Sequence, residues 1–375
     1  MPKSDQHYMS LAVQAAQNGQ GCVEPNPMVG CVIVADDQVI GLGWHEKFGG
    51  PHAEINAIAS VKAELKDKIA GATAYVSLEP CSHQGKTGPC CDALIAAKIA
   101  RVVIAVMDPN PKVSGQGIAK MQAAGIELVT DVMTDAANQL LAPYLKRTLC
   151  GLPWVIAKWA MTIDGSIATA SGDSQWISNE KSRKRVHDLR RRVDAVMVGV
   201  GTALADDPML NPRPAGKRIV TRVVVDSAAR LPLDSKLVTT SNEFPTLIAV
   251  DGDQANEQAD KIAALEASGC QVWRSGLGQD PDQRLLGLLK HLAGQGVTNL
   301  MVEGGGQILG ALNDLSLIDE VHLFVGAKLL GGKNSLSPVA GTGPSLMNAA
   351  SEMQLLQVER IDNDVYSVYR RVNER

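Results

Sequence analysis

The chain has 375 residues, of which 45% are hydrophobic and 20% charged, and its formal net charge is −4. This length favours two domains over a single core, and the composition excludes a fibrous or intrinsically disordered protein. The charge gives no general attraction to nucleic acid or to an anionic membrane, and an aromatic content of 3% weakens any prediction of a surface for stacked bases.

The N-terminal segment is polar and typical of a helix, with Ser4 as its N-cap and Gly19 as its stop. It lacks the basic start and apolar stretch of a secretory signal, and no run of about 18 apolar residues predicts a membrane span. The seven cysteines are an odd number spread thinly along the chain. They favour reduced thiols over a disulfide framework, so we expect a cytoplasmic protein.

The first part of the chain alternates strand-like and helix-like segments. The expected strands cover residues 29–34, 39–42, 73–78, 102–106 and 126–130. The expected helices cover residues 4–18, 52–65, 90–100, 118–124 and 135–149. The turn Asp36–Asp37 separates the first two strands, which predicts a hairpin. Strands separated by helices predict an α/β fold in which helices cover a sheet.

A breaker, Gly151–Leu152–Pro153, ends the helix expected over 135–149, and the pattern then starts again. The expected strands cover residues 155–161, 195–200, 218–226, 246–250, 271–274, 299–302 and 320–325, and residues 353–372 predict a closing hairpin. The expected helices cover residues 179–192, 254–267, 281–293 and 307–312. We therefore predict two domains, residues 1–150 and 151–375.

One group of residues has the composition of a catalytic zinc site. His52 lies at a predicted helix start, Cys81 follows a predicted strand, and Cys90 opens the next helix. One histidine and two cysteines meet the count of a catalytic zinc ion, which keeps a fourth position open for water. Glu54 lies two residues after the histidine and is suited to move a proton from that water to a leaving amine. The order His-x-Glu, Pro-Cys, Cys is typical of zinc deaminases.

Three alternatives remain open at this point. A closed structural zinc site would need a fourth ligand, for which Cys91 and His83 are the candidates. A deaminase that edits nucleic acid would share the metal motif but would need basic and aromatic surfaces. A non-catalytic zinc protein whose C-terminal half only binds a nucleotide would release no ammonia.

Longer motifs in the first half of the chain resemble one particular family of proteins. They are Asn26–Pro27–Met28–Val29–Gly30, His52–Ala53–Glu54, Glu79–Pro80–Cys81–Ser82–His83, Gly85–Lys86–Thr87–Gly88–Pro89–Cys90 and the segment from Met107 to Gly117. Together they resemble the RibD family of bifunctional deaminase/reductases of riboflavin biosynthesis. The resemblance implies a cytidine-deaminase-like three-layer α/β/α domain that deaminates 2,5-diamino-6-(ribosylamino)-4(3H)-pyrimidinone 5′-phosphate, with Asn26 and Lys86 on the substrate. The family usually has Pro where this chain has Gly88, which removes no ligand.

Motifs in the second half also resemble this family. They are Lys158–Gly165, Ser174–Ser178, Val198–Thr202, Leu204–Pro208, Leu210–Arg213, Val225–Ser227 and Val302–Gly306. The resemblance implies a dihydrofolate-reductase-like domain that reduces the ribosyl group of 5-amino-6-(5-phosphoribosylamino)uracil to ribityl with NADPH. It places on the cofactor Ala160, Trp176, Thr202, Asp206, Ser227, Gly305, Gly306, Gln307, Ile308, Leu309, Gly310 and Ala311. It places on the substrate Ser174, Arg190, Leu210, Arg213 and Glu303.

Physical arguments support part of this assignment. A glycine run between a strand and a helix lets backbone N–H groups approach a phosphate, although the run Gly304–Gly306 would also suit a tight turn. Arg190 and Arg213 are suited to bind a phosphate through two parallel hydrogen bonds. Lys158 and Asp164 either orient the sugar or pyrimidine or form a surface ion pair. The spacing of residues does not decide between NADPH and NADH.

Seven lysines and arginines lie between Lys181 and Arg192. Such a run is found in nucleic-acid-binding proteins, but on a helix these cations would spread over several solvated faces. We therefore expect a small pyrimidine ribotide as substrate, no nucleic-acid or membrane partner, and one zinc ion per chain. The family resemblance implies a homo-oligomer, either a dimer or a tetramer.

Overall fold

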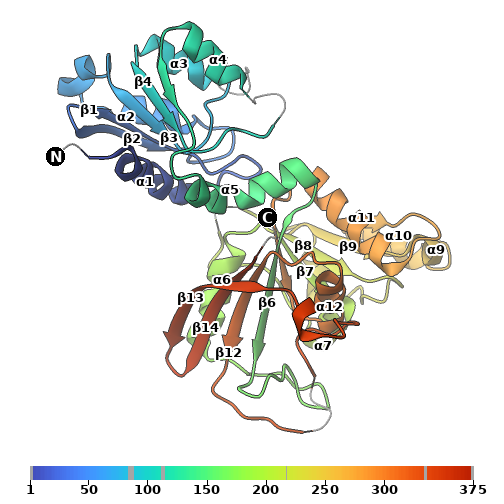
Figure 1. Ribbon diagram of the computed structural model, residues 1–375. Coiled ribbons are helices and arrows are strands. Elements are labelled where there is room, and N and C mark those ends of the chain that lie inside the picture. Colours follow the sequence, from blue (N-terminus) through green and yellow to red (C-terminus); the bar gives the residue numbers. More distant parts are fainter. Residues whose placement is uncertain (1–2, 83–87, 111–114, 217, 333–335, 373–375) are drawn as a thin grey trace. The chain divides into compact units, whose positions relative to one another are not determined.

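The computed structural model of the chain describes residues 3–82, 88–110, 115–216, 218–332 and 336–372 (Figure 1). The chain divides into two compact units, Met1–Leu152 and Pro153–Arg375. Among the described residues, no helix combines the length and the apolar character needed to cross a membrane.

The first unit contains a five-stranded sheet with the strand order β2-β1-β3-β4-β5 (Figure 1). Its strands are β1 Gly30–Ala35, β2 Gln38–Trp44, β3 Thr73–Val76, β4 Arg101–Ile104 and β5 Glu127–Val129. Its helices are α1 Asp5–Ala16, α2 Ala53–Ser60, α3 Cys90–Ala96, α4 Gln116–Ala123 and α5 Thr134–Cys150. The first two strands form the predicted antiparallel hairpin, and β3, β4 and β5 run parallel.

Helices cover both faces of this sheet. Successive side chains of a strand point to opposite sides, so alternate residues of one strand belong to different cores. Cys31 and Ile33 of β1 are buried in one core with residues of α2, α3 and α4. Val32 and Val34 belong to a second core with residues of α1 and α5. Helix α2 lies against β2 where that strand has no side chain, since a Cβ on Gly43 would lie 2.2 Å from a backbone nitrogen of the helix. The result is the expected three-layer α/β/α arrangement.

Two predicted helices of this unit end earlier than the sequence indicates. Helix α2 ends at Ser60, where the backbone of Val61 is extended, and a separate 3₁₀ turn, Ala63–Lys68, follows. The hydroxyl of Ser60 accepts a hydrogen bond from Leu42 of β2 and donates one to its own helix. Helix α3 ends at Ala96, because Lys98 adopts a left-handed backbone with φ of 55°.

The second unit contains a nine-stranded sheet with the order β10-β9-β8-β7-β11-β6-β12-β14-β13 (Figure 1). Its strands are β6 Trp154–Met161, β7 Ala195–Gly199, β8 Thr221–Val225, β9 Thr246–Val250, β10 Gln271–Arg274, β11 Asn299–Glu303, β12 Glu320–Val325, β13 Met353–Ile361 and β14 Asp364–Arg371. Its helices are α6 Glu180–Arg190, α7 Val200–Asp206, α8 Lys236–Thr239, α9 Gly252–Ala255, α10 Ala259–Ala267, α11 Pro281–Gly294 and α12 Gly306–Asp314.

Most of the predicted strands of this unit are confirmed, and three of them, β9, β10 and β12, have the predicted bounds. Strands β10, β9, β8, β7, β11, β6 and β12 run parallel. The C-terminal hairpin continues the sheet in antiparallel pairing, with β14 next to β12 and β13 at the edge. The prediction missed α7 and α8, and the helix expected over 254–267 is divided into α9 and α10. Strand β11 lies between β6 and β7, so the order in which the chain adds strands reverses there. In α/β sheets such a point binds ligands at the carboxyl ends of the strands.

Candidate zinc centre and reductase site

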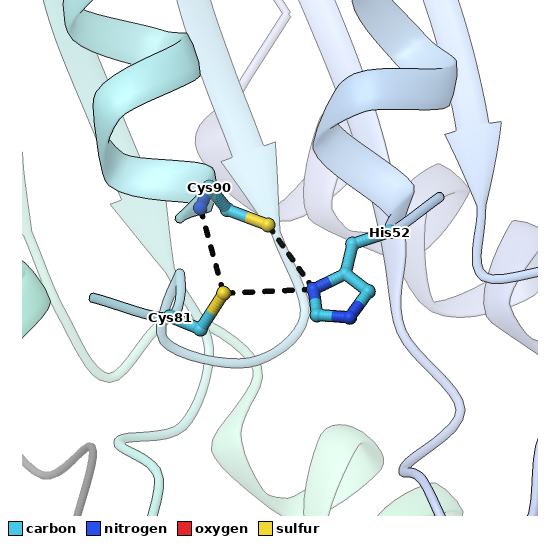
Figure 2. A group of neighbouring side chains, drawn as sticks. All are labelled: His52, Cys81 and Cys90. Atoms are coloured by element: carbon cyan, nitrogen blue, oxygen red, sulfur yellow. Dashed lines mark hydrogen bonds between the residues drawn. The ribbon is translucent and has the colours of Figure 1, made fainter. Parts of the chain in front are cut away.

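Three side chains from separate segments meet in the first unit (Figure 2). His52 is the N-cap residue of α2, Cys81 lies in the loop after β3, and Cys90 is the first residue of α3. The Nδ1 atom of His52 lies 3.2 Å from Sγ of Cys90 and 3.5 Å from Sγ of Cys81. The backbone N–H of Cys90, at the helix start, donates to Sγ of Cys81 over 3.4 Å.

This spacing fits a zinc ion. Bond lengths of about 2.3 Å to sulfur and about 2.0–2.1 Å to nitrogen place tetrahedral nitrogen and sulfur ligands about 3.6 Å apart. Among the described residues, the group of possible ligands contains His52, Cys81 and Cys90 alone. Cys91 is fully buried in the core, where its thiol donates to Asp92 over 3.8 Å. Three ligands would leave one tetrahedral position open among the described residues; His83, the other candidate for a fourth ligand, lies outside them.

The pKa values of the two thiols are shifted in opposite directions. The hydrogen bond from the Cys90 thiol lowers the pKa of Cys81 to about 4, and His52 contributes in the same direction. The same interaction, together with burial, raises the pKa of Cys90. The pair therefore holds a negative charge on Cys81, at the position where a cation would bind.

Glu54 lies in the first turn of α2, and its side chain is only 3% exposed. Burial raises the pKa of its carboxyl group, and the negative charge on Cys81 raises it further. Glu54 also interacts with the Cys90 thiol. A carboxylate that holds its proton more tightly than usual is suited to accept a proton and then to deliver it.

His52, Glu54 and Cys81 line a cavity of about 380 Å³. The polar and charged residues in its wall include Asn26, His45, Glu54, Glu79, Asp108, Asn110, Tyr144, Arg147 and Thr148. The size suits a small molecule better than a polymer. Lys86, which the sequence predicts on the substrate, lies outside the described residues.

The position of Asn26 is controlled by a buried histidine. Nδ1 of His45 lies 3.0 Å from the carbonyl oxygen of Pro51, and Nε2 lies 3.1 Å from Nδ2 of Asn26. Because a carbonyl only accepts, Nδ1 carries the proton and Nε2 accepts from the Asn26 amide. Burial lowers the pKa of His45, which favours this neutral form. The amide oxygen of Asn26 is then left to accept a hydrogen bond from a substrate in the cavity.

One wall of the cavity was not predicted. The carboxylate of Asp108 accepts hydrogen bonds from the Tyr144 hydroxyl, at 2.9 and 3.2 Å, and from the backbone of Asn110 at 2.9 Å. The carboxylate of Glu79 accepts from the backbone of Asp108 and Gly115 through Oε2, and its Oε1 has no hydrogen-bond partner among the described residues. The motifs around Glu79 and Asp108 were available as signals, but Tyr144 lies in a helix that the sequence presents only as a connection.

A buried ionic cluster lies in the second unit, where β6 and β11 pair in parallel. Lys158 and Glu303 are opposite each other in this register, and Nζ lies 3.5 Å from the carboxylate. Arg190 of α6 binds the same carboxylate with two hydrogen bonds of 2.6 and 2.9 Å. Burial raises the pKa of Glu303, but Arg190 and Lys158 outweigh it and hold this pKa at about 2. At Lys158 burial dominates and lowers the pKa.

The contacts in and around this cluster change the interpretation of three predicted residues. The Arg190 guanidinium is already bound to Glu303 and to the carbonyl of Asn211, so it organises the site as well as carrying charge toward it. Lys158 pairs with Glu303 in the interior, and Asp164 accepts hydrogen bonds from the backbone of Leu330 and Gly331, so these two residues do not form the surface ion pair considered as an alternative.

The glycine turn after β11 lies close to the start of α7, beside the ionic cluster. The left-handed backbone at Gly304 and Gly305, with φ of 68° and 79°, leads into the N-terminus of α12. A Cβ at either position would lie 3.6 Å from the hydroxyl oxygen of Thr202, so the start of α7 approaches this turn closely. In the first turn of α12 the N–H group of Ile308 donates to the carbonyl of Gly305, whereas those of Gly306 and Gln307 have no carbonyl of their own helix to donate to and suit the phosphates of a dinucleotide. The predicted cofactor residues from 305 to 311 run from this turn into the second turn of α12, where Leu309 and Gly310 are buried.

The other predicted cofactor residues lie on neighbouring elements. Ala160 is near the end of β6, and Ser227 follows β8, where its carbonyl accepts from Asp251. Trp176 is 57% exposed, and the Arg183 guanidinium lies 4.4 Å from its ring centre. Asp206 ends α7 and interacts with Gln175.

The other predicted substrate residues lie in loops. Ser174 is in the segment before Trp176, and Leu210 is buried with a left-handed backbone. Arg213 is exposed, and its backbone N–H donates to Nδ1 of His187 over 3.2 Å.

The basic run of α6 is largely neutralised. Lys181 pairs with Asp362, Arg185 with Glu359, Arg190 with Glu303, and Arg191 with Asp188. The cations spread over different faces, as expected for a helix.

Comparison with known proteins gives matches over both units. Residues 2–106 match the family described as the cytidine and deoxycytidylate deaminase zinc-binding region, and residues 153–367 match the family described as the RibD C-terminal domain. The chain is 39% identical to riboflavin biosynthesis protein RibD of Actinobacillus pleuropneumoniae, covering 98% of this chain and 95% of the relative. It is 37% identical to RibD of Aquifex aeolicus, covering 98% of each.

Solved structures agree. The fold is similar to Acinetobacter baumannii RibD, with a TM-score of 0.83 and 33% identity over 98% of this chain and 99% of that structure. It is also similar to a diaminohydroxyphosphoribosylaminopyrimidine deaminase/5-amino-6-(5-phosphoribosylamino)uracil reductase from Thermotoga maritima, with a TM-score of 0.82 and 32% identity over 98% and 99%. These matches confirm the expected α/β class, with a cytidine-deaminase-like unit followed by a reductase unit.

Proposed function

The chain belongs to the RibD family of riboflavin biosynthesis proteins, and from this premise we propose how its residues carry out the two reactions of the family. The protein is a bifunctional enzyme with a zinc-dependent deaminase and an NADPH-dependent reductase activity. The observation that carries the residue assignment is the convergence of His52, Cys81 and Cys90 beside the buried carboxyl group of Glu54.

In the deaminase reaction, His52, Cys81 and Cys90 would hold the zinc ion. When bound, zinc lowers the pKa of a water ligand to about 7, so that a nucleophile forms at neutral pH. Glu54 accepts the proton from the attacking water and delivers it to the departing amine of the pyrimidine ribotide. The oxygen of Asn26 accepts from the substrate, because one N–H of the amide donates to Nε2 of His45 and so fixes the orientation of the amide.

In the reductase reaction, NADPH would supply the hydride that converts the ribosyl group to ribityl. As C1 of the sugar is reduced, its bond to the ring oxygen breaks, and that oxygen takes a proton. Lys158 is suited to donate it, because burial lowers its pKa and outweighs the opposite effect of Glu303, which lies 3.5 Å away. Arg213 binds the substrate phosphate, while Arg190 holds Glu303 and the adjoining loop in place.

The substrate is a small molecule, as for other enzymes of this family. We extend this to a protein that acts in the cytoplasm as a homo-oligomer, either a dimer or a tetramer, without a nucleic-acid partner. Paired charges support the last point, because three cations of α6 and Arg191 at its C-cap already contact carboxylates.

A coupled assay tests the proposed function. The enzyme is supplied with the diaminopyrimidine ribotide and NADPH, and ammonia release and NADPH absorbance are followed together. We expect one ammonia and one oxidised NADPH for each ribotide consumed. Ammonia without oxidation would remove the reductase assignment, and deamination of tRNA or single-stranded DNA without turnover of the ribotide would overturn the proposed substrate.

A further inference from the structure

The loop that carries Arg213 is fastened to α6 at two points. Nη1 of Arg190 donates to the carbonyl of Asn211 over 3.2 Å, and the backbone N–H of Arg213 donates to Nδ1 of His187 over 3.2 Å. His187 and Arg190 are three residues apart, so their side chains lie on the same face of the helix. Both ends of a three-residue segment are therefore held by one helix turn.

The hydrogen bond determines the protonation of His187. A nitrogen that accepts from an N–H carries no proton, so the neutral imidazole has its proton on Nε2. Burial lowers the pKa of His187, and Arg190 and Arg213 lower it further, whereas Glu303 and the carbonyl of Asn211 act in the opposite direction.

The three arginine and lysine side chains of the site differ in their freedom to meet a substrate. Arg190 and Lys158 are buried against Glu303. Arg213 is exposed, so its guanidinium is the one that reaches an incoming phosphate most directly. Its direction depends on the main chain from which it projects, and His187 holds that main chain.

We propose that His187 is a positioning residue for the reductase reaction, and that it acts by fixing the backbone at Arg213 so that the guanidinium meets the phosphate of the ribotide. This inference rests on the proposed role of Arg213 in phosphate binding. His187 does not itself contact the reacting atoms. Its removal therefore weakens substrate binding and leaves the chemical step largely intact.

The first experiment measures reductase kinetics with the deaminated ribotide. In H187L we expect the KM for the ribotide to rise about three- to tenfold, which corresponds to the loss of one ordinary hydrogen bond. We expect kcat and the KM for NADPH to stay within about twofold. H187N should recover most of the loss, because its amide oxygen can occupy the place of Nδ1. The control K184Q changes an exposed residue one turn earlier on α6 and should leave all constants unchanged.

A double-mutant cycle distinguishes positioning from a general structural role. If His187 acts through Arg213, H187L has no further effect on KM in the R213Q background. Equal effects of H187L in both backgrounds, or a fall in kcat instead of a rise in KM, would overturn the proposal. An unchanged KM in R213Q alone would overturn the phosphate role of Arg213 and the proposal with it. Chemical denaturation of the second unit of each variant reports its folding, and a wild-type enzyme without reductase activity would instead refute the proposed function.

Discussion

The Tyr144 hydroxyl donates a hydrogen bond of 2.9 Å to the buried carboxylate of Asp108, and both residues line the cavity beside the zinc ligands. Loss of this donor leaves a carboxylate in the cavity wall without one of its partners, which costs about 1.5–3 kcal/mol for a hydrogen bond to a charged group. We therefore expect Y144F to lower deaminase kcat/KM by about tenfold or more. Ammonia release measures this effect. Zinc content and reductase turnover should be unchanged, and a loss of both activities would indicate a folding defect instead.

Replacing Glu54 with glutamine should remove deamination while zinc is retained. Glutamine has nearly the same shape but cannot accept and return a proton, so the rate should fall by about 10²–10⁴-fold. Zinc content by elemental analysis and ammonia release together check the result. Normal deamination by E54Q would show that another group moves the proton.

Removal of the metal should separate the two activities. A chelator that strips zinc should abolish ammonia release. The variant C81S should do the same, because a site with three protein ligands loses most of its affinity for zinc when one of them is removed. NADPH oxidation with the deaminated ribotide should persist at the wild-type rate. Added zinc should restore the chelated enzyme but not C81S. Parallel loss of both activities on chelation would contradict separate sites.

Glu303 should contribute to stability in a defined range of pH. Its ordinary pKa of 4.5 is lowered in the folded protein to about 2, which corresponds to about 3 kcal/mol. A lowered pKa means that this stabilisation is fully present above about pH 5 and is lost as the pH falls toward 2. Chemical denaturation of the second unit at several pH values measures this dependence.

The variant E303Q should be unstable even at neutral pH. It leaves Arg190 and Lys158 buried without their carboxylate, and breaking such a pair costs about 3–5 kcal/mol. The acid dependence between pH 5 and 2 should be weaker in E303Q than in the wild-type enzyme. E359Q, which removes the partner of the more exposed Arg185, is the matched control and should cost at most about 1 kcal/mol. Equal losses in the two variants would contradict the special role of Glu303.

Local signals were sufficient for much of the fold. Ser4 accepts from the backbone of His7 at the predicted helix start, and the Asp36–Asp37 turn has the left-handed backbone that a tight hairpin requires. The buried strands of the second unit were equally clear, because parallel strands covered on both faces are continuously apolar.

The sequence fails to predict elements and contacts that depend on parts of the chain far apart in sequence. Val200 continues an apolar run and so resembles part of a strand, but Gly199 ends β7 and opens α7. In the site, residue types and order were sufficient to predict His52, Cys81, Cys90 and Glu54 as neighbours. The partnership of Asp108 with Tyr144 spans 36 residues, and no local pattern encodes it.

Helix α5 has a consequence for attempts to separate the two activities. In the order of the gene it is a connector, yet it supplies Tyr144, Arg147 and Thr148 to the cavity of the first unit. A deaminase fragment that stops before Thr134 would therefore lack part of its substrate cavity, whereas one that continues through Cys150 would retain it. The shortest autonomous deaminase is thus defined by a helix that lies beyond the last strand of its sheet.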